Sequence, residues 1–420
     1  MTEQEIQRSL KTRWLRAAAF APVLLILGLL YAWSLFIAPL EAEFGWLRTE
    51  TSVTFTVSMI AFCFGSFLAA RIARQMPARV SAIICGILMC LGFIGASRAN
   101  TLWFFILCYG GLAGFGTGVG YNVTVALVSA WFPDRRGIMS GVSLMFFGVG
   151  SFVLGSVVTN VMEAMGWRQA LIVIGLIAGI GVVLASSAFK FPPEGMRFPE
   201  GKKIKSHTAA ISLKPSQVLR SPEFYVLFAW ISIRGGGSYM VTSNAAPIAM
   251  ELGVSQADTL LFVGAISVMN GLGRVISGAI YDKIGRRASF GVTTAALSVT
   301  IIFLFLAFRL ESRAMLFAAF FSTGYALGGS APANIVCMQE FFGDKYYSGN
   351  LSLTTLTTVI SSSFPVYITG YIQTTTGSYF NMLYVMAGLS IASWVLFFLM
   401  RKPSDEEIDR ILHHKGRHHV

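Results

Sequence analysis

Residues 192–222, PPEGMRFPEGKKIKSHTAAISLKPSQVLRSP, form the only long polar stretch of this 420-residue chain. On either side the sequence consists of long apolar runs, six before the polar stretch and six after it. A helix that crosses the roughly 30 Å hydrocarbon core of a bilayer needs about 20 mostly apolar residues. The runs that meet this requirement are 17–40, 51–73, 79–98, 101–129, 137–162, 168–191, 223–251, 257–281, 288–309, 312–339, 347–372 and 378–400.

The composition also indicates a membrane protein. Hydrophobic residues make up 55% of the chain and charged residues 12%, about half of the roughly 25% charged residues typical of soluble domains. The low charge argues against a soluble multidomain enzyme, and the apolar content excludes a disordered chain. We predict an all-α integral membrane fold with twelve transmembrane helices in two six-helix bundles. The predicted parts are an N-terminus (1–16), a bundle (17–191), a linker (192–222), a bundle (223–400) and a tail (401–420).

The basic residues predict the orientation of the chain. The net charge is +12, from 32 Lys and Arg against 20 Asp and Glu. With the N-terminus in the cytoplasm, 25 basic residues lie in cytoplasmic segments and five on the opposite side. Cytoplasmic loops are rich in Lys and Arg, so we expect both termini to be cytoplasmic and the chain to lie in a cell (inner) membrane. Topology accounts for the surplus of charge, and no nucleic-acid partner is expected.

The two remaining basic residues lie within predicted spans, and the first of them is Arg274. It follows Asn270 by four residues, a spacing that places both side chains on one helical face. About 10 Å of helix separates Arg274 from the cytoplasmic end of its span. The arginine could therefore snorkel to the interface. Alternatively, its guanidinium is a fixed site for an anionic substrate, with Asn270 as a second donor.

Arg234 is the second intramembrane cation and lies near the middle of its predicted span. Three glycines follow it directly, and they predict local unwinding of the kind that transporters place beside a cavity. Arg234 could bind the substrate as a second cation. It could equally bind unwound backbone carbonyls and organise a gate, and both interpretations stay open.

The acids complete this picture, because no Asp, Glu or His lies in the middle of a predicted span. Buried cations without an internal counter-ion are costly, and a bound anion would compensate them. The five cysteines lack metal-like spacing, so we expect no metal and no cofactor. A nucleophile–base pair is also missing, which argues against an enzyme.

Polar and aromatic residues in other spans complete a candidate pocket. Tyr121, Asn122 and Tyr325 lie in or next to glycine-rich runs, which helix packing alone could also explain. Tyrosine offers an apolar wall and a hydroxyl donor. Thr354 and Thr357 belong to a Ser/Thr run, in which about half of the hydroxyls are expected to bond their own helix backbone.

The chain resembles the major facilitator superfamily along nearly its whole length. Residues 278–287 (GAIYDKIGRR) are similar to the superfamily's loop motif between spans 8 and 9, with Asp282, Arg286 and Arg287 as conformational residues. The loop after span 2, residues 69–79, lacks the aspartate of that motif. Residues 131–137 (WFPDRRG), which carry Asp134, Arg135 and Arg136, follow span 4 as residues 341–345 (FFGDK) follow span 10.

Within the superfamily, the chain is most similar to the oxalate/formate antiporter and monocarboxylate transporter group. The matching stretches are 31–40 (YAWSLFIAPL), 44–46 (FGW), 120–122 (GYN), 131–137 and 270–274 (NGLGR). The resemblance implies that Arg274 holds a substrate carboxylate and that Tyr121 and Tyr325 line the cavity. Tyr31 and Asn122 lie in the matching stretches and are further candidate substrate-binding residues.

Two departures from this group affect the expected substrate. Animal monocarboxylate carriers have an aspartate one turn before the arginine, where this chain has Asn270. The oxalate exchanger has a lysine in span 11 as its second cation, where this chain has the run around Thr354 to Thr358. If Arg234 supplies the second charge, a dicarboxylate is favoured. If Arg234 is structural, a monocarboxylate fits better.

We therefore expect a secondary transporter of small organic anions, mono- or dicarboxylates, that works by alternating access between two bundles. Exchange (antiport) is favoured because an empty carrier would hold uncompensated cations. Proton-coupled monocarboxylate symport stays an alternative, with a coupling proton carried on the substrate or through Glu340. A transporter-like carboxylate sensor is a third hypothesis. The lipid bilayer and small carboxylate anions are the expected partners of a monomeric chain.

Overall fold

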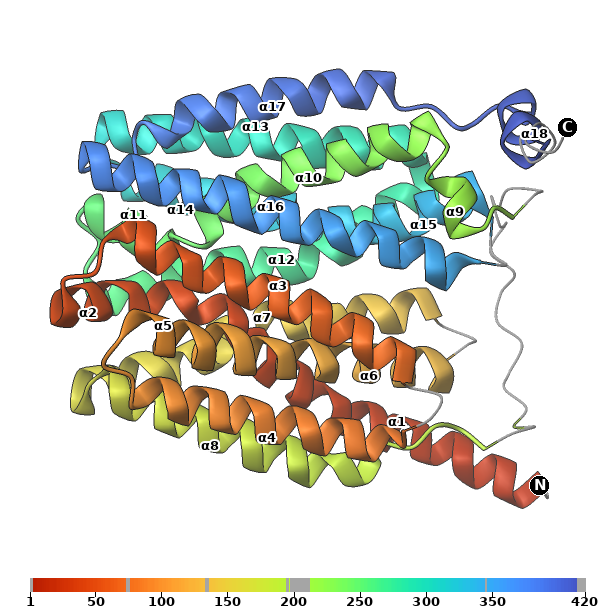
Figure 1. Cartoon of the computed structure of the whole chain (residues 1–420), viewed down its shortest axis with the longest axis horizontal. Coiled ribbons are helices and arrows are strands. Elements are labelled where there is room, and N and C mark those ends of the chain that lie inside the picture. The colour runs from red at the N-terminus through yellow and green to blue at the C-terminus, as the bar shows by residue number, and fades with distance from the viewer. Residues whose placement is uncertain are drawn as a thin grey trace, which may run out of the picture.

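The computed structural model describes residues 3–72, 76–132, 136–193, 196, 212–343 and 346–413, and the regular elements within them are helical. Figure 1 shows two halves of long, roughly parallel helices, α1–α8 in red to yellow and α10–α17 in green to blue. Both chain ends lie at the same end of the molecule, which we call the proximal face. The opposite end, where α2 and α11 lie, is the distal face. The predicted orientation, with the proximal face in the cytoplasm, stays a prediction.

The first bundle contains the helices before the linker. They are α1 (Glu3–Leu27), η1 (Gly28–Trp33), α2 (Ser34–Phe44), α3 (Arg48–Ile72), α4 (Ala78–Ser97), α5 (Leu102–Phe105), η2 (Ile106–Ala113), α6 (Gly114–Trp131), α7 (Arg136–Met165), α8 (Trp167–Ala185) and η4 (Ser186–Ala188). The first three form one continuous span, and α5, η2 and α6 form another.

The second bundle contains two spans that are interrupted. Its helices are α10 (Pro222–Thr242), α11 (Ala245–Glu251), α12 (Gln256–Ile284), α13 (Arg286–Leu310), α14 (Arg313–Gly328), α15 (Ser330–Phe342), α16 (Tyr347–Thr376) and α17 (Met382–Leu399), with the short α9 (Pro215–Val218) before them and α18 (Asp405–His413) after them. The helical structure is interrupted between α10 and α11 at Asn244 and between α14 and α15 at Gly329.

Within the described residues, nine helices are long and apolar enough to cross a membrane. The three other predicted spans lie on α10 with α11, on α14 with α15, and on α16. The break at Gly329 leaves α14 with 16 residues, and α16 is rich in Ser and Thr over its 30 residues. The predicted all-α membrane fold is confirmed, and the twelve predicted spans are consistent with it.

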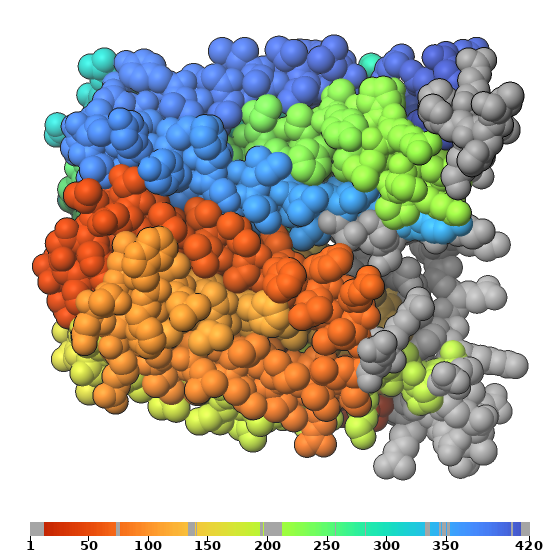
Figure 2. Space-filling view, in the orientation of Figure 1, coloured from red at the N-terminus to blue at the C-terminus, as the bar shows by residue number. Residues whose placement is uncertain are grey.

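The two bundles meet where α3 contacts α16 and where α7 contacts α12. Figure 2 shows atoms of α3 (orange-red) directly against those of α16 (blue) near the distal face. At the second contact, a Cβ atom on Gly148 of α7 would lie 2.8 Å from the backbone nitrogen of Gly271 of α12. This close approach brings the next turn of α12, which carries Arg274, against the first bundle.

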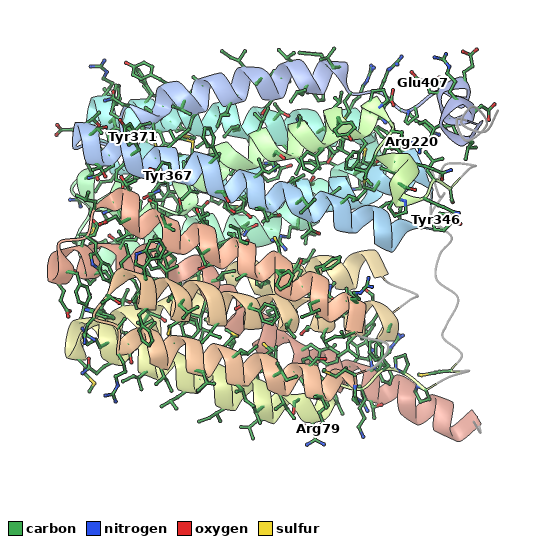
Figure 3. All side chains as sticks on the ribbon, viewed as in Figure 1. Arg79, Arg220, Tyr346, Tyr367, Tyr371 and Glu407 are labelled. Carbon is green, nitrogen blue, oxygen red and sulfur yellow. The ribbon has the colours of Figure 1, made fainter. Side chains whose placement is uncertain are left out.

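Parts of the predicted linker and tail pack against the second bundle. Val218 of α9 and Ile408 and Ile411 of α18 are buried in one apolar cluster with Phe342 of α15. The isoleucines are three residues apart, so they share one face of α18. Arg220 and Glu407 mark this proximal end in Figure 3. Most of the linker and the histidines at positions 414, 418 and 419 lie outside the described residues, and the predicted domain limits stay a prediction.

Replacing Gly118 by alanine should destabilise the first bundle. A Cβ atom at this position of α6 would lie 2.0 Å from the carbonyl oxygen of Phe62 on α3, so the two helices must move apart. Overpacking typically costs about 1–3 kcal/mol, and the melting temperature of the detergent-solubilised protein should fall by several degrees. Gly388→Ala on α17 is the control, because a Cβ atom there meets nothing within 4 Å. Equal melting temperatures in the two variants would contradict this packing.

Candidate functional site

Arg274 lies in α12 on the side that faces the first bundle. Its side chain is 8% exposed, and the guanidinium carbon lies 6.0 Å from the ring centre of Phe147 on α7. A cation is attracted to the face of an aromatic ring, most strongly when both are shielded from water. Since the side chain is directed to Phe147, it does not reach the proximal surface as a snorkelling arginine would.

Asn270 lies one turn before Arg274, as the spacing predicts. Nη2 of Arg274 donates to Oδ1 of Asn270 across 3.4 Å, which is a long hydrogen bond. Nε of Arg274 is buried and has no hydrogen-bond partner among the described residues. None of the ion pairs between described side chains involves Arg274. A guanidinium carries five N–H donors, so this one can still bind an anionic acceptor.

Three tyrosines surround this pair of residues. Tyr121 of α6 interacts with the guanidinium of Arg274, and the Tyr31 hydroxyl interacts with the side chains of Asn270 and Tyr239. The rings of Tyr31 and Tyr121 pack against Phe147 at centroid distances of 5.6 and 5.0 Å. The site is therefore built from both bundles, with η1, α6 and α7 on one side and α10 and α12 on the other.

Tyr239 is a member of this cluster that sequence reasoning missed. It follows Arg234 by five residues on α10, and its side chain interacts electrostatically with both Arg234 and Arg274. The sequence does contain a signal for it, because Tyr239 lies in the same predicted span as the intramembrane Arg234. On that ground it is a candidate pocket residue like Tyr121 and Tyr325.

A small cavity of about 10 Å³ borders Asn270. Its lining residues are Tyr31, Thr242, Val263, Ile266, Ser267 and Asn270. This volume holds about one water molecule, so even a small carboxylate needs the surrounding helices to move. The Ser267 hydroxyl also bonds Ser151 of α7, which joins the cavity wall to the first bundle.

Arg234 of α10 has a different environment, because one of its donors has a backbone acceptor, although its Nε, like that of Arg274, has no hydrogen-bond partner among the described residues. Its side chain is 1% exposed, and Nη1 donates to the backbone carbonyl of Ala326 on α14. Ala326 lies in the last turn of α14, where carbonyls lack intrahelical donors and carry partial negative charge. The guanidinium carbon also lies 5.3 Å from the ring centre of Trp230. Arg234 thus joins α10 to the end of α14.

The expected unwinding at residues 235–237 is wrong, because α10 continues through all three glycines to Thr242. These glycines instead allow close helix packing. A Cβ atom on Gly235 would lie 2.8 Å from Oγ of Ser361, and one on Gly236 would lie 2.7 Å from Cγ of Pro365. Both contacts are with α16, so the glycines let this helix approach the backbone of α10.

The remaining substrate-binding candidates are placed as follows. Tyr325 of α14 is buried with no partner for its hydroxyl among the described residues, and its backbone lies against Gly273. Asn122 donates to Ser66 of α3 across 3.3 Å, within the first bundle.

Thr354 and Thr357 are both buried. The Thr357 hydroxyl donates to the carbonyl of Thr354, which agrees with the expectation that part of this hydroxyl run bonds its own helix.

The predicted conformational motif is partly described. Arg286 of α13 forms an ion pair of 3.4 Å with Glu340 of α15, whose carboxylate also accepts a hydrogen bond from Tyr281. Arg287 is exposed. Asp134 and Arg135 lie outside the described residues, as do the side chains of Arg136 and Asp282. Among the described residues, no group of three His, Cys, Asp or Glu could hold a metal ion.

Solved structures share this architecture. A bacterial homolog of the human lysosomal transporter Spinster, in an inward-facing conformation, aligns with a TM-score of 0.75 at 14% identity, over 94% of this chain and 99% of that one. The xylose transporter XylE from Escherichia coli aligns with a TM-score of 0.71 at 14% identity, again over 94% and 99%. At this identity the likeness shows the fold alone.

Sequence relatives agree with the suspected group. The MFS-type transporter YhjX of Escherichia coli, itself uncharacterized, is 27% identical over 82% of this chain and 83% of its own length. The oxalate:formate antiporter of Oxalobacter formigenes is 26% identical over 78% and 76%. Monocarboxylate transporter 13 of Bos taurus is 24% identical over 94% and 92%. The model of the Major Facilitator Superfamily matches residues 18–365 and 235–417, and the chain belongs to this family of membrane transporters.

Proposed function

We propose that this protein transports small monocarboxylates by alternating access, with exchange of one anion for another as its favoured mode. The observation that carries the proposal is the buried guanidinium of Arg274, which lies between the bundles with donors left for an anion. A substrate carboxylate there would bind a fork of N–H donors and would touch both bundles. The distant relatives named for oxalate, formate and monocarboxylate transport support a small carboxylate anion as the substrate.

The preference for one carboxylate follows from the different partners of the two arginines. Arg234 bonds the carbonyl of Ala326 and stacks on Trp230. Arg274 instead interacts with Tyr121 and lies near Tyr31, which contacts Asn270 and lines the cavity. Both arginines have an unpartnered Nε among the described residues, but only Arg274 lies without a backbone acceptor beside the cavity, and one such cation matches one carboxylate. A second substrate carboxylate would have to compete with the Ala326 carbonyl for Arg234.

Exchange is favoured because the empty site leaves the charge of Arg274 uncompensated. Moving that charge through a closed intermediate is costly, and a bound anion lowers the cost in both directions.

Glu340, the candidate for a coupling proton, is engaged by Tyr281 and Arg286 at the proximal end. Tyr281 lies seven residues beyond Arg274, about 10 Å along the helix. Proton symport would therefore need a second connection between Glu340 and the site.

Uptake of labelled lactate, pyruvate, formate and oxalate into proteoliposomes tests the proposal. We expect monocarboxylate uptake to rise when the vesicles contain an unlabelled anion. In Arg274→Ala, uptake at low substrate concentration should fall by roughly 30-fold, since a charge-assisted hydrogen bond contributes about 2 kcal/mol. Arg309→Ala, which removes an exposed arginine at the distal end of α13, is the control. Wild-type uptake in Arg274→Ala would exclude this residue as the anion site.

Replacing Arg234 by lysine separates a structural role from substrate binding. Lysine keeps the charge but lacks the planar fork that reaches both the Ala326 carbonyl and the Trp230 ring. We expect a lower melting temperature and an unchanged ratio of lactate to oxalate uptake. A changed ratio between mono- and dicarboxylates would instead assign Arg234 to the substrate.

Replacing Asn270 by aspartate should make transport depend on pH. The new carboxylate would form an ion pair with Arg274 at neutral pH and compete with the substrate anion. Protonation at acidic pH neutralises the carboxyl and frees the guanidinium, so uptake should be low at pH 7 and recover as the pH falls. Asn122→Asp is the matched control, because Asn122 bonds Ser66 rather than Arg274. The same pH profile in both variants would argue against an interaction between Asn270 and Arg274.

A further inference from the structure

The distal face contains a second buried arginine cluster, centred on Arg48 at the start of α3. Nε and Nη2 of Arg48 donate to the two carboxylate oxygens of Glu41 on α2, both across 2.6 Å. This is the two-pronged geometry in which a guanidinium binds a carboxylate most strongly. Glu41 also accepts a hydrogen bond from Thr51 across 2.8 Å. The ion pair therefore fixes the direction of the remaining nitrogen, Nη1.

That nitrogen crosses to the second bundle, where it donates to the hydroxyl of Tyr379 in the turn between α16 and α17. The Tyr379 hydroxyl in turn donates to Oδ1 of Asn244 across 3.2 Å. The carboxylate of Glu251 on α11 accepts from the backbone N–H of Tyr379 across 3.0 Å and holds this turn in place. Each donor in the chain from Arg48 to Asn244 thus has its acceptor.

This connection is shielded from water, unlike most ion pairs at a protein surface. The exposed fractions are 7% for Arg48, 2% for Tyr379 and 1% for Asn244. Hydrogen bonds in such surroundings are stronger than in water, and a member left without its partner is costly. Separating the bundles at this face would leave the Arg48 donor and the Tyr379 hydroxyl without each other.

The cluster lies at the distal end of the α3–α16 contact. Thr49 and Thr374 share a hydrogen bond of 2.8 Å, and farther along the same helices Thr56 donates to the carbonyl of Ser362 across 3.1 Å. Figure 3 labels Tyr371 near this end of α16 and Tyr346 at the other. A break at Arg48 and Tyr379 would open the contact from its outermost point.

We propose that Glu41, Arg48, Tyr379 and Asn244 form a latch that holds the two bundles together at the distal face. The latch must break before the site at Arg274 can open to that side. It controls the balance between conformations and does not depend on which solute the protein carries.

The distance between the bundles at the distal face tests the latch without any substrate. Nitroxide labels are placed at Leu47→Cys and Thr375→Cys, two exposed positions on opposite bundles, in full-length protein that also carries Cys90→Ala. Double electron–electron resonance then gives the distance distribution. We expect one short distance in the otherwise unchanged chain. Tyr379→Phe, which removes only the hydroxyl, should add a population at longer distance.

Two matched controls separate the latch from general effects. Tyr384→Phe changes a tyrosine that is 70% exposed on α17 and should leave the distribution unchanged. Arg168→Lys alters the other distal arginine–glutamate pair, Arg168 with Glu43 across 2.9 Å, which lies within the first bundle. Arg48→Lys should increase the population at longer distance, whereas Arg168→Lys should not. Identical distributions in Tyr379→Phe, Arg48→Lys and the parent protein, at similar melting temperatures, would overturn the latch.

A reversible cross-link supplies a second measurement should Tyr379→Phe or Arg48→Lys fold poorly. Thr49→Cys with Thr374→Cys places two thiols where the hydroxyls now bond. Oxidation should prevent the distal face from opening and stop anion exchange, and a reductant should restore it. Full exchange in the oxidised protein would contradict a distal opening step, whereas absent exchange in both states would count against the proposed substrates only.

Discussion

Holding the Arg274 guanidinium inside the bilayer is the constraint on which the arrangement of the two bundles depends. A buried charge is costly unless nearby groups compensate it. Phe147, Asn270 and the tyrosine hydroxyls provide partial compensation, and no described carboxylate pairs with the guanidinium. Because Phe147 and Tyr121 belong to one bundle and Asn270 to the other, the stability of the charge depends on how the bundles are positioned. On the proposed function, an anion bound at Arg274 would change that dependence, and binding would then be coupled to movement.

Comparison with Arg234 shows that burial alone does not define a site. Both arginines are intramembrane, and Arg234 is the more buried of the two. Its charge is partly compensated by a hydrogen bond to the Ala326 carbonyl at the end of α14 and by a cation–π contact with the ring of Trp230. That compensation comes from within one bundle and stays constant when the bundles move. Within its own bundle Arg274 has only the long bond to Asn270, and its partners Phe147 and Tyr121 belong to the other bundle. This difference favours Arg274 as the residue that binds substrate.

The sequence predicts features that depend on composition and short spacing. The helical runs, the polar linker and the shared face of Asn270 and Arg274 follow from such local patterns. The acceptor of Arg234 could not be predicted, because Ala326 is 92 residues away and its carbonyl is free only where α14 ends. The three glycines after Arg234 wrongly predict unwinding for a related reason. Glycine permits both unwinding and close packing, and the partner helices, α16 for Gly235 and Gly236 and α13 for Gly237, decide between them.

Arg48 illustrates the same limit at the distal face. In the sequence it is one of five basic residues predicted to lie on the outer side, and its partner Tyr379 is 331 residues away. The structure connects this pair to the site through the end of α10. Asn244 donates to the carbonyl of Met240 across 3.2 Å, and Tyr239 and Thr242 of the same turns contact the site. A shift of this segment on anion binding would change the position of Asn244, and with it the acceptor that orients the Tyr379 hydroxyl.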